Sequence, residues 1–170
     1  MSLLSFAGDV RTASNTFRPF RPDPVQPDAL RAALERARLA TWRLVTVTDP
    51  TMRLAIRDAH LPHWRRYLAE TGGARILAAD APARQARDLR VADAFALSLH
   101  EAPVHLVLLG RTSGSLRTTA LSDLADGLRA EGMDAAPVPC AAQCAGEIGT
   151  LLGLDDGLVV SGVLAARPVR

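Results

Sequence analysis

The 170-residue sequence contains no lysine, few aromatic residues and only two cysteines. Its 20 basic residues are therefore all arginine, which together with the alanine, glycine and proline content indicates a GC-rich bacterial genome. Because Phe, Trp and Tyr make up only 4% of the chain, we expect a core built mainly from aliphatic side chains. Two cysteines are too few for a disulfide framework, which favours a cytoplasmic protein.

The sequence also lacks an apolar run long enough to span a membrane, and residues 1–6 lack the basic and long apolar parts of a signal peptide. The net charge is +2, and arginines are interleaved with acidic residues along the chain. A basic stripe with interleaved aromatics, which is typical of nucleic-acid-binding proteins, is absent. We therefore expect that the protein binds neither membranes nor nucleic acids.

No self-contained catalytic motif occurs, since the sequence has no G-x-S-x-G, P-loop or G-x-G-x-x-G pattern. His60 and His63 form an H-x-x-H pair, but no carboxylate stands at the offset that a metal site needs, and Pro62 interrupts the pair. A closed metal site also needs four ligands. We therefore expect these histidines to be solvated at helix ends, with no metal bound.

The remaining candidate groups have simpler structural interpretations. Cys140 and Cys144 are four residues apart rather than in a C-x-x-C motif, which favours two small buried apolar side chains over a redox or zinc site. His100 and Glu101 end a helix before a strand that contains His105, but no serine or cysteine nucleophile lies nearby in sequence. We therefore assign no catalytic residue from the sequence.

Hydrophobic periodicity and turn residues predict a single domain over residues 1–170. Strands and helices do not alternate strictly, which favours an α+β class over a doubly wound sheet. Asp49 and Pro50 form a helix-start signal, and Gly132 marks a helix end. Strands are predicted at residues 42–48, 104–109 and 158–165, with an extended piece at 135–139. Helices are predicted at residues 3–14, 28–39, 51–59, 63–70, 81–100 with a break near Arg90, 121–128 and 141–152.

Residues 104–109 form an almost continuous apolar run between Pro103 and Gly110. Such a run has no polar side to turn towards water, as in strands that are covered on both faces. We therefore expect this segment to be a central strand of the sheet.

Four groups of residues, in the same order along the chain, resemble motifs of the FMN-dependent nitroreductase family. Residues 16–25 (TFRPFRPDPV) resemble its N-terminal signature, in which R-x-S-x-R runs into F-x-P-D-P-V. Residues 42–50 (WRLVTVTDP) and 101–109 (EAPVHLVLL) are similar to its strands P-W-R-F-V-V-V-x-D-P and E-A-P-V-L-L-V-V. Residues 128–133 (LRAEGM) and 151–154 (LLGL) are similar to R-A-E-G-L-G and L-L-G-I-P. The resemblance extends over most of the chain.

This resemblance implies an α+β fold with a central, mainly antiparallel sheet flanked by helices. It also implies an obligate homodimer with FMN bound at the dimer interface. In the family, NAD(P)H reduces the flavin, and the flavin then reduces a nitroaromatic, a quinone or a similar acceptor. The cofactor carries that chemistry, while the protein positions it.

The resemblance also assigns cofactor-binding residues. The family's R-x-S-x-R pattern falls on residues 14–18, where Ser14 replaces the first arginine. Thr16 keeps a hydroxyl that can hydrogen-bond, and Arg18 can contact a phosphate or a flavin carbonyl. Arg167 and Arg170 are the residues left of the family's basic C-terminal tail.

Two departures from the family pattern leave the activity open. Thr41 alone stands where the family has a polar P-S-x-x-N-x-Q loop against the flavin ring, and the basic tail is short. One interpretation is a short FMN-dependent oxidoreductase. A second is a dimeric scaffold that binds flavin weakly or not at all and acts as a non-catalytic binding or flavin-holding module. A third is that loop residues are missing from the sequence itself.

Overall fold

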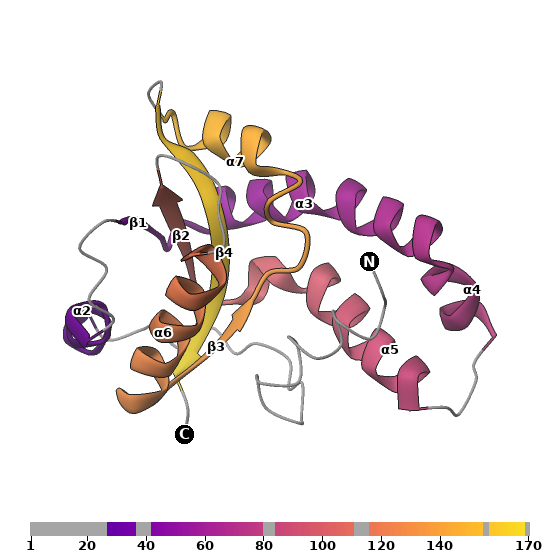
Figure 1. The fold of residues 1–170 in the computed structure, drawn as a ribbon, viewed down its shortest axis with the longest axis horizontal. Helices are drawn as coiled ribbons and strands as arrows, with labels where there is room; N and C mark the ends of the chain where they lie inside the picture. Colours follow the sequence, from indigo (N-terminus) through magenta and orange to yellow (C-terminus); the bar gives the residue numbers. More distant parts are fainter. Residues whose placement is uncertain (1–26, 37–41, 80–83, 111–115, 155–156, 169–170) are drawn as a thin grey trace.

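A four-stranded sheet, in the order β1-β2-β4-β3, is the centre of the fold, and every neighbouring pair of strands is antiparallel. We analysed a computed structural model, which describes residues 27–36, 42–79, 84–110, 116–154 and 157–168 (Figure 1). The sheet and its flanking helices confirm the predicted α+β class. The strands are β1 (Arg43–Val47), β2 (Val104–Gly110), β3 (Met133–Pro137) and β4 (Val159–Pro168).

Strand β2 lies inside the sheet, paired with β1 on one side and β4 on the other. All seven of its residues are buried, which confirms the central strand predicted from the apolar run. Val107 lies opposite Val45 of β1 and Val163 of β4, and a register shift follows at Leu108. The continuous apolar sequence therefore reflects cover on both faces.

Helix α6 (Leu116–Ala130) covers one face of the sheet, and α2 (Pro27–Arg36) packs beside it (Figure 1). We call the buried apolar group beneath α6 the α6-face cluster. Leu124 and Leu128 of α6 meet side chains of β2, β3 and β4 there. Gly132 follows the helix with φ 74°, a left-handed conformation that suits glycine, as its predicted place at a helix end requires. The α6-face cluster contains Val104, Leu106, Leu124, Ala125, Leu128, Met133, Ala135, Leu164 and Ala166.

The opposite face is covered by α3 (Pro50–Thr71), α5 (Arg84–Leu97) and α7 (Ala145–Leu151) (Figure 1). Because successive side chains of a strand alternate between faces, Val107 and Leu109 of β2 point to this side. They pack with Ile56 of α3, Phe95 of α5 and Ile148 of α7. We call this side of the sheet the α3 face.

Helix α3 is a single helix, so the two separate helices predicted at 51–59 and 63–70 are wrong. It begins at the predicted cap, where Asp49 Oδ1 accepts a hydrogen bond of 2.8 Å from the Met52 backbone N–H. Pro62 lies inside it and removes one backbone hydrogen bond. Trp64 and Leu68 are buried against α5 on the far side of Pro62, and this packing offsets the loss. Gly72 ends the helix with φ 76°.

Several other predicted boundaries need correction. Helix α4 (Gly73–Ala78) was not predicted, and α5 runs through Arg90 without the predicted break. A short 3₁₀ helix, η1 (Leu99–Glu101), separates α5 from β2. Helix α7 starts at Ala145, because residues 141–144 form turns. The predicted helix at 3–14 and the end of the one at 28–39 lie outside the described residues.

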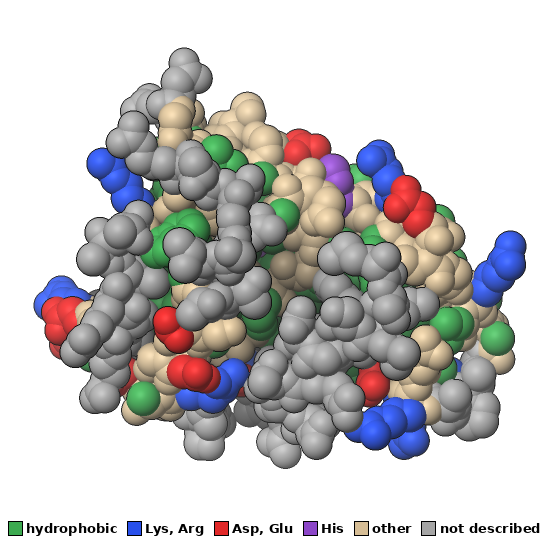
Figure 2. All heavy atoms as spheres, viewed as in Figure 1, with side chains coloured by type: hydrophobic (Ala, Val, Ile, Leu, Met, Phe, Trp, Pro, Cys, Tyr) green, Lys and Arg blue, Asp and Glu red, His purple; other side chains and the backbone are tan. Residues whose placement is uncertain are grey.

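None of the described helices combines the length and the apolar character that crossing a bilayer requires. On the face drawn in Figure 2, the described basic and acidic side chains are mixed over the surface rather than gathered by sign.

Candidate functional site

The predicted cofactor-binding residues fall into two groups. Ser14, Thr16, Arg18 and Arg170 lie outside the described residues, so their assignment stays a prediction. Arg167 lies in β4, and its Nη2 donates a hydrogen bond of 3.0 Å to Oδ2 of Asp134.

The Arg167–Asp134 ion pair connects β4 to the edge strand β3. The two residues lie directly opposite one another in the antiparallel register, and their side chains are 19% and 21% exposed. This pair could not be predicted from the sequence, because the register of β3 on β4 depends on long-range strand pairing. A phosphate at Arg167 would share the guanidinium with the Asp134 carboxylate. The assignment of Arg167 to the cofactor stays a prediction.

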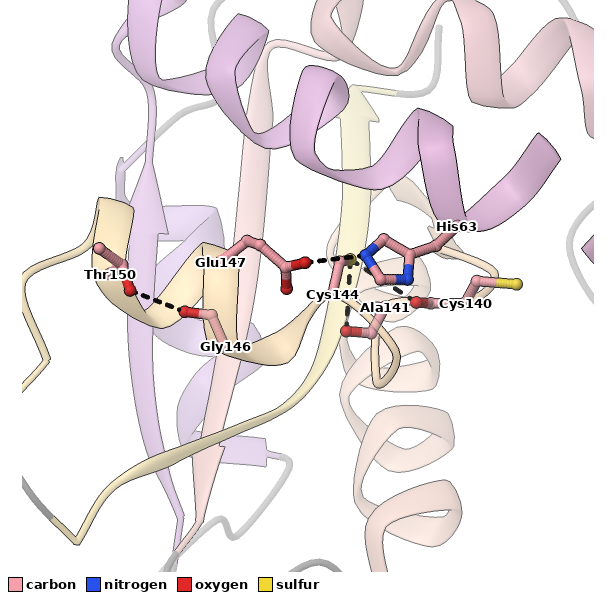
Figure 3. A network of polar contacts seen from close by, with 7 residues as sticks. All are labelled: His63, Cys140, Ala141, Cys144, Gly146, Glu147 and Thr150. Atoms are coloured by element: carbon pink, nitrogen blue, oxygen red, sulfur yellow. Dashed lines mark hydrogen bonds and ion pairs between the residues drawn. The ribbon is translucent and has the colours of Figure 1, made fainter. Parts of the chain in front are cut away.

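Two histidines of α3 contact α7 and the segment that connects β3 to it. His60 is fully buried, and its Nε2 lies 2.6 Å from the carbonyl oxygen of Pro139. One turn later, His63 Nε2 lies 2.9 Å from Oε1 of Glu147, as Figure 3 shows. The prediction that both histidines are solvated at helix ends is therefore wrong, because α3 continues through Pro62 and carries His60 into the interior.

The protonation state of His60 follows from its surroundings. Burial lowers its pKa from 6.5 to about 4, despite the opposing effect of the hydrogen bond to Pro139, so the imidazole is neutral at pH 7. A carbonyl oxygen only accepts, so Nε2 carries the proton and donates it. His60 is therefore a neutral structural contact.

The pKa of Glu147 is lowered, first by its own backbone N–H and then by His63.

The two cysteines are free thiols in the same segment. Cys144 is buried, and its Sγ points to the carbonyl oxygens of Cys140 and Ala141 (Figure 3). Cys140 is half-buried, and Figure 3 shows its sulfur pointing away from His63. Burial raises the pKa of each thiol to about 11, so neither is a thiolate nucleophile at pH 7. The predicted role as small buried side chains is confirmed for Cys144.

His105 occupies the interior of β2, with its side chain fully buried on the α3 face. Its Nε2 lies 2.8 Å from the carbonyl oxygen of Leu99. Burial lowers the pKa of His105 to about 4; the hydrogen bond to Leu99 opposes this effect, and the nearby charge of Arg53 adds to it. The neutral ring therefore donates from Nε2 to η1, which agrees with the structural role predicted for it.

Arg53 of α3 binds the same turn. Its Nη1 donates to the carbonyl oxygens of His100, at 3.0 Å, and of Ala102. Burial lowers the pKa of Arg53, although Asp49 opposes this effect. Arg53 could not be recognised from the sequence, because an arginine on a helix usually belongs to the solvated face. Within the described ranges, no group of three or more His, Cys, Asp or Glu side chains is placed to hold a metal ion.

No protein-family model and no curated protein sequence matches the chain. Solved structures, in contrast, match it over nearly its whole length. An iodotyrosine deiodinase bound to FMN and 3-iodo-L-tyrosine superposes with a TM-score of 0.67 at 18% identity, covering 96% of this chain and 90% of that one. The FMN-dependent nitroreductase NfnB from Mycobacterium smegmatis, in complex with NADPH, gives 0.61 at 18% identity, covering 98% and 89%.

The chain has the nitroreductase fold. A BluB-like flavoprotein from Clostridium difficile also superposes, with a TM-score of 0.65 at 14% identity, covering 100% of this chain and 91% of that one. The resemblance found in the sequence motifs is thus confirmed for the fold. In this nitroreductase fold, the matched strand motifs at residues 42–50 and 101–109 include β1 and β2, which are hydrogen-bonded neighbours.

Proposed function

We propose that the protein is an oxidoreductase that binds FMN, takes electrons from NAD(P)H and passes them to a nitro compound, a quinone or a similar acceptor. The observation that carries this proposal is the likeness to the flavoproteins over at least 96% of the chain. The iodotyrosine deiodinase is bound to FMN, and the NfnB nitroreductase is named as FMN-dependent and is in complex with NADPH. When bound, FMN supplies the hydride and electron chemistry, and the chain supplies position and charge.

The cofactor contacts in this proposal come from residues 14–18. Arg18 is the charged position of the family motif that this sequence retains, and Thr16 adds a neutral hydroxyl. Arg167 contributes little, because Asp134 already holds its guanidinium. We therefore assign the principal anion contact to Arg18.

A second candidate function is a non-catalytic module that keeps the nitroreductase fold and holds flavin weakly or not at all. The absence of the first motif arginine at Ser14 and the reduction of the polar loop to Thr41 favour it. The engagement of Arg167 with Asp134 points the same way. Weak binding without electron transfer is the behaviour that separates this candidate from the enzyme.

We also propose that residues 1–170 form one domain that assembles as a cytoplasmic homodimer. Three apolar side chains remain 38–46% exposed in one chain, namely Leu54 on α3 and Val91 and Leu97 on α5. A second copy would remove such apolar area from water. Light scattering across the micromolar range is expected to give the mass of two chains, and the mass of one chain throughout would overturn the proposal.

Titration of FMN against the purified protein, followed by quenching of flavin fluorescence, tests the assignment. A charge-assisted hydrogen bond contributes about 1.5–3 kcal/mol, so Arg18→Ala should weaken FMN binding roughly tenfold to a hundredfold. Thr16→Ala should cost on the order of 1 kcal/mol, because its donor is neutral. Arg31→Ala, on the exposed part of α2, is the control and should leave the affinity unchanged.

Two outcomes contradict the proposal in different ways. Nanomolar binding that Arg18→Ala leaves unchanged rejects the assignment of the residue but keeps the cofactor. Absence of binding even at millimolar FMN rejects the enzyme and leaves the scaffold.

A further inference from the structure

The carbonyls of the turn at η1 accept hydrogen bonds from Arg53 and His105, and each of these residues has a further nitrogen that is buried. Arg53 of α3 donates from Nη1 to the carbonyls of His100 and Ala102, and His105 of β2 donates from Nε2 to that of Leu99. After these bonds, Arg53 Nε, His105 Nδ1 and His100 Nδ1 are each buried without a hydrogen-bond partner among the described residues. Three polar atoms from three elements are thus left unsatisfied around one turn.

These nitrogens differ in what they offer. Arg53 Nε always carries a hydrogen and is a donor. His105 is neutral and uses its one N–H at Nε2, so its Nδ1 is an acceptor with a lone pair. His100 Nδ1 can take either role, depending on the tautomer. A buried polar atom without a partner costs about 1–3 kcal/mol, so a group that satisfies a donor and an acceptor together stabilises the turn.

The chemistry of these atoms restricts the ligand. An anion would accept from Arg53 Nε but would be repelled by the lone pair of His105 Nδ1. A metal ion would suit the lone pair but not the arginine, and the described residues supply no metal-binding group here. Water both accepts and donates, and buried waters typically make about three hydrogen bonds to otherwise unsatisfied groups.

We propose that one internal water molecule binds between Arg53, His105 and His100, and joins α3 to β2 behind η1. It accepts from Arg53 Nε, donates to His105 Nδ1 and makes its third bond with His100 Nδ1. The small buried side chain of Ala102 adds only a methyl group at this turn. The water thereby gives Arg53 Nε and His105 Nδ1 a hydrogen-bond partner each. This inference is independent of whether FMN binds.

A crystal structure of the full chain at a resolution that shows ordered solvent tests the site directly. We expect one density peak within about 2.7–3.2 Å of both Arg53 Nε and His105 Nδ1. Absence of a peak, or a protein atom bonded to either nitrogen, overturns the proposal. A peak that bromide replaces in a soaked crystal also overturns it, since the ligand would then be an anion.

Nuclear magnetic resonance gives a second test in solution. We expect a nuclear Overhauser contact between a long-lived water and the His105 ring, with the ¹⁵N shift of an unprotonated Nδ1. Arg53→Lys keeps a charge that can reach the η1 carbonyls but removes Nε–H, so the water contact should be lost. Arg57→Lys, one turn along α3 and paired with Asp58, is the matched control and should keep it. An unchanged contact in Arg53→Lys contradicts the proposed donor.

Discussion

The α6-face cluster buries apolar side chains, whereas the α3 face buries two imidazoles and partly buries an arginine among its aliphatic groups. On the α6 face, stability depends on area removed from water, which has no directional requirement. On the α3 face, each polar group has to find a backbone carbonyl, and His60, His105 and Arg53 all do. The α3 face is therefore the side whose geometry is specified by hydrogen bonds, and the side that responds to pH.

The largest expected effect is that of a charge placed in the sheet. Val107 is fully buried in the apolar core on the α3 face, so Val107→Asp places a carboxylate out of reach of water. The cost of burying an unpaired charge approaches the whole stability of a domain, so we expect no soluble folded protein. Expression and thermal melting measure this. Leu151→Asp on α7, at a side chain that is 36% exposed, is the control. Normal yield and melting of Val107→Asp would show that β2 is not central.

Acidification should lower the free energy of unfolding through the two buried histidines of the α3 face. His60 and His105 have pKa values of about 4 when folded and 6.5 as the ordinary value, so the unfolded chain binds protons first as the pH falls. Their contribution to the free energy of unfolding is complete above pH 6.5 and is lost as the pH falls towards 4. The loss amounts to about 3 kcal/mol for each imidazole over that range.

Urea unfolding between pH 7 and pH 4.5 measures this loss. In the double variant His60→Gln/His105→Gln, the amides can donate to the same carbonyls without titrating, so the fall in stability should be smaller. Carboxylates contribute equally to both proteins and cancel in the comparison. Parallel pH profiles for the wild type and the double variant would contradict the buried, neutral histidines.

In the α6-face cluster, removal of buried side-chain volume should lower the free energy of unfolding, and pH should not change this effect. Leu128 is fully buried in the α6-face cluster, and Leu128→Ala should cost about 2–5 kcal/mol of unfolding free energy through lost contacts and a cavity. The difference from the wild type should be the same at pH 7 and pH 5, because no titrating group belongs to this cluster. Denaturant unfolding at the two pH values checks this, and a pH-dependent difference would remove the distinction between the faces.

The smallest effect concerns backbone strain beside the α3 face. Cys140 has φ 56°, in the left-handed region, which costs a residue with a Cβ roughly 1–2 kcal/mol. Cys140→Gly removes that strain but adds freedom to the unfolded chain, so we expect a gain of less than about 1 kcal/mol. At Cys144, with φ −101°, the same substitution should only destabilise. A loss at Cys140 as large as the loss at Cys144 would show that the strain is absent.

The sequence predicted the parts of the fold that depend on local pattern. The apolar run at 104–109 became β2, and the Asp49 cap and the Gly132 helix end are where the residue types placed them. These features depend on neighbouring residues alone. The fold itself was predicted from the family resemblance of several short motifs rather than from periodicity.

The parts that the sequence did not predict depend on long-range packing. Pro62 suggested a helix break, but burial of Trp64 and Leu68 keeps α3 continuous. The burial of His60 follows from that continuity, and its partner Pro139 lies 79 residues away. The Arg167–Asp134 pair likewise needs the register of β3 on β4. Of the predicted cofactor residues, only Arg167 falls within the described part of the chain, and the others stay predictions.

Reduction of bound flavin by a nicotinamide cofactor is the direct test of whether the protein is an FMN-dependent oxidoreductase. Purified protein is loaded with FMN, kept anaerobic and mixed with NADPH or NADH, and the absorbance of oxidised flavin is followed. We expect this absorbance to fall faster than that of free FMN under the same conditions and to return when a quinone or nitroaromatic compound is added. Flavin that stays bound and oxidised with both nicotinamides, or a rate equal to that of free FMN, would contradict it.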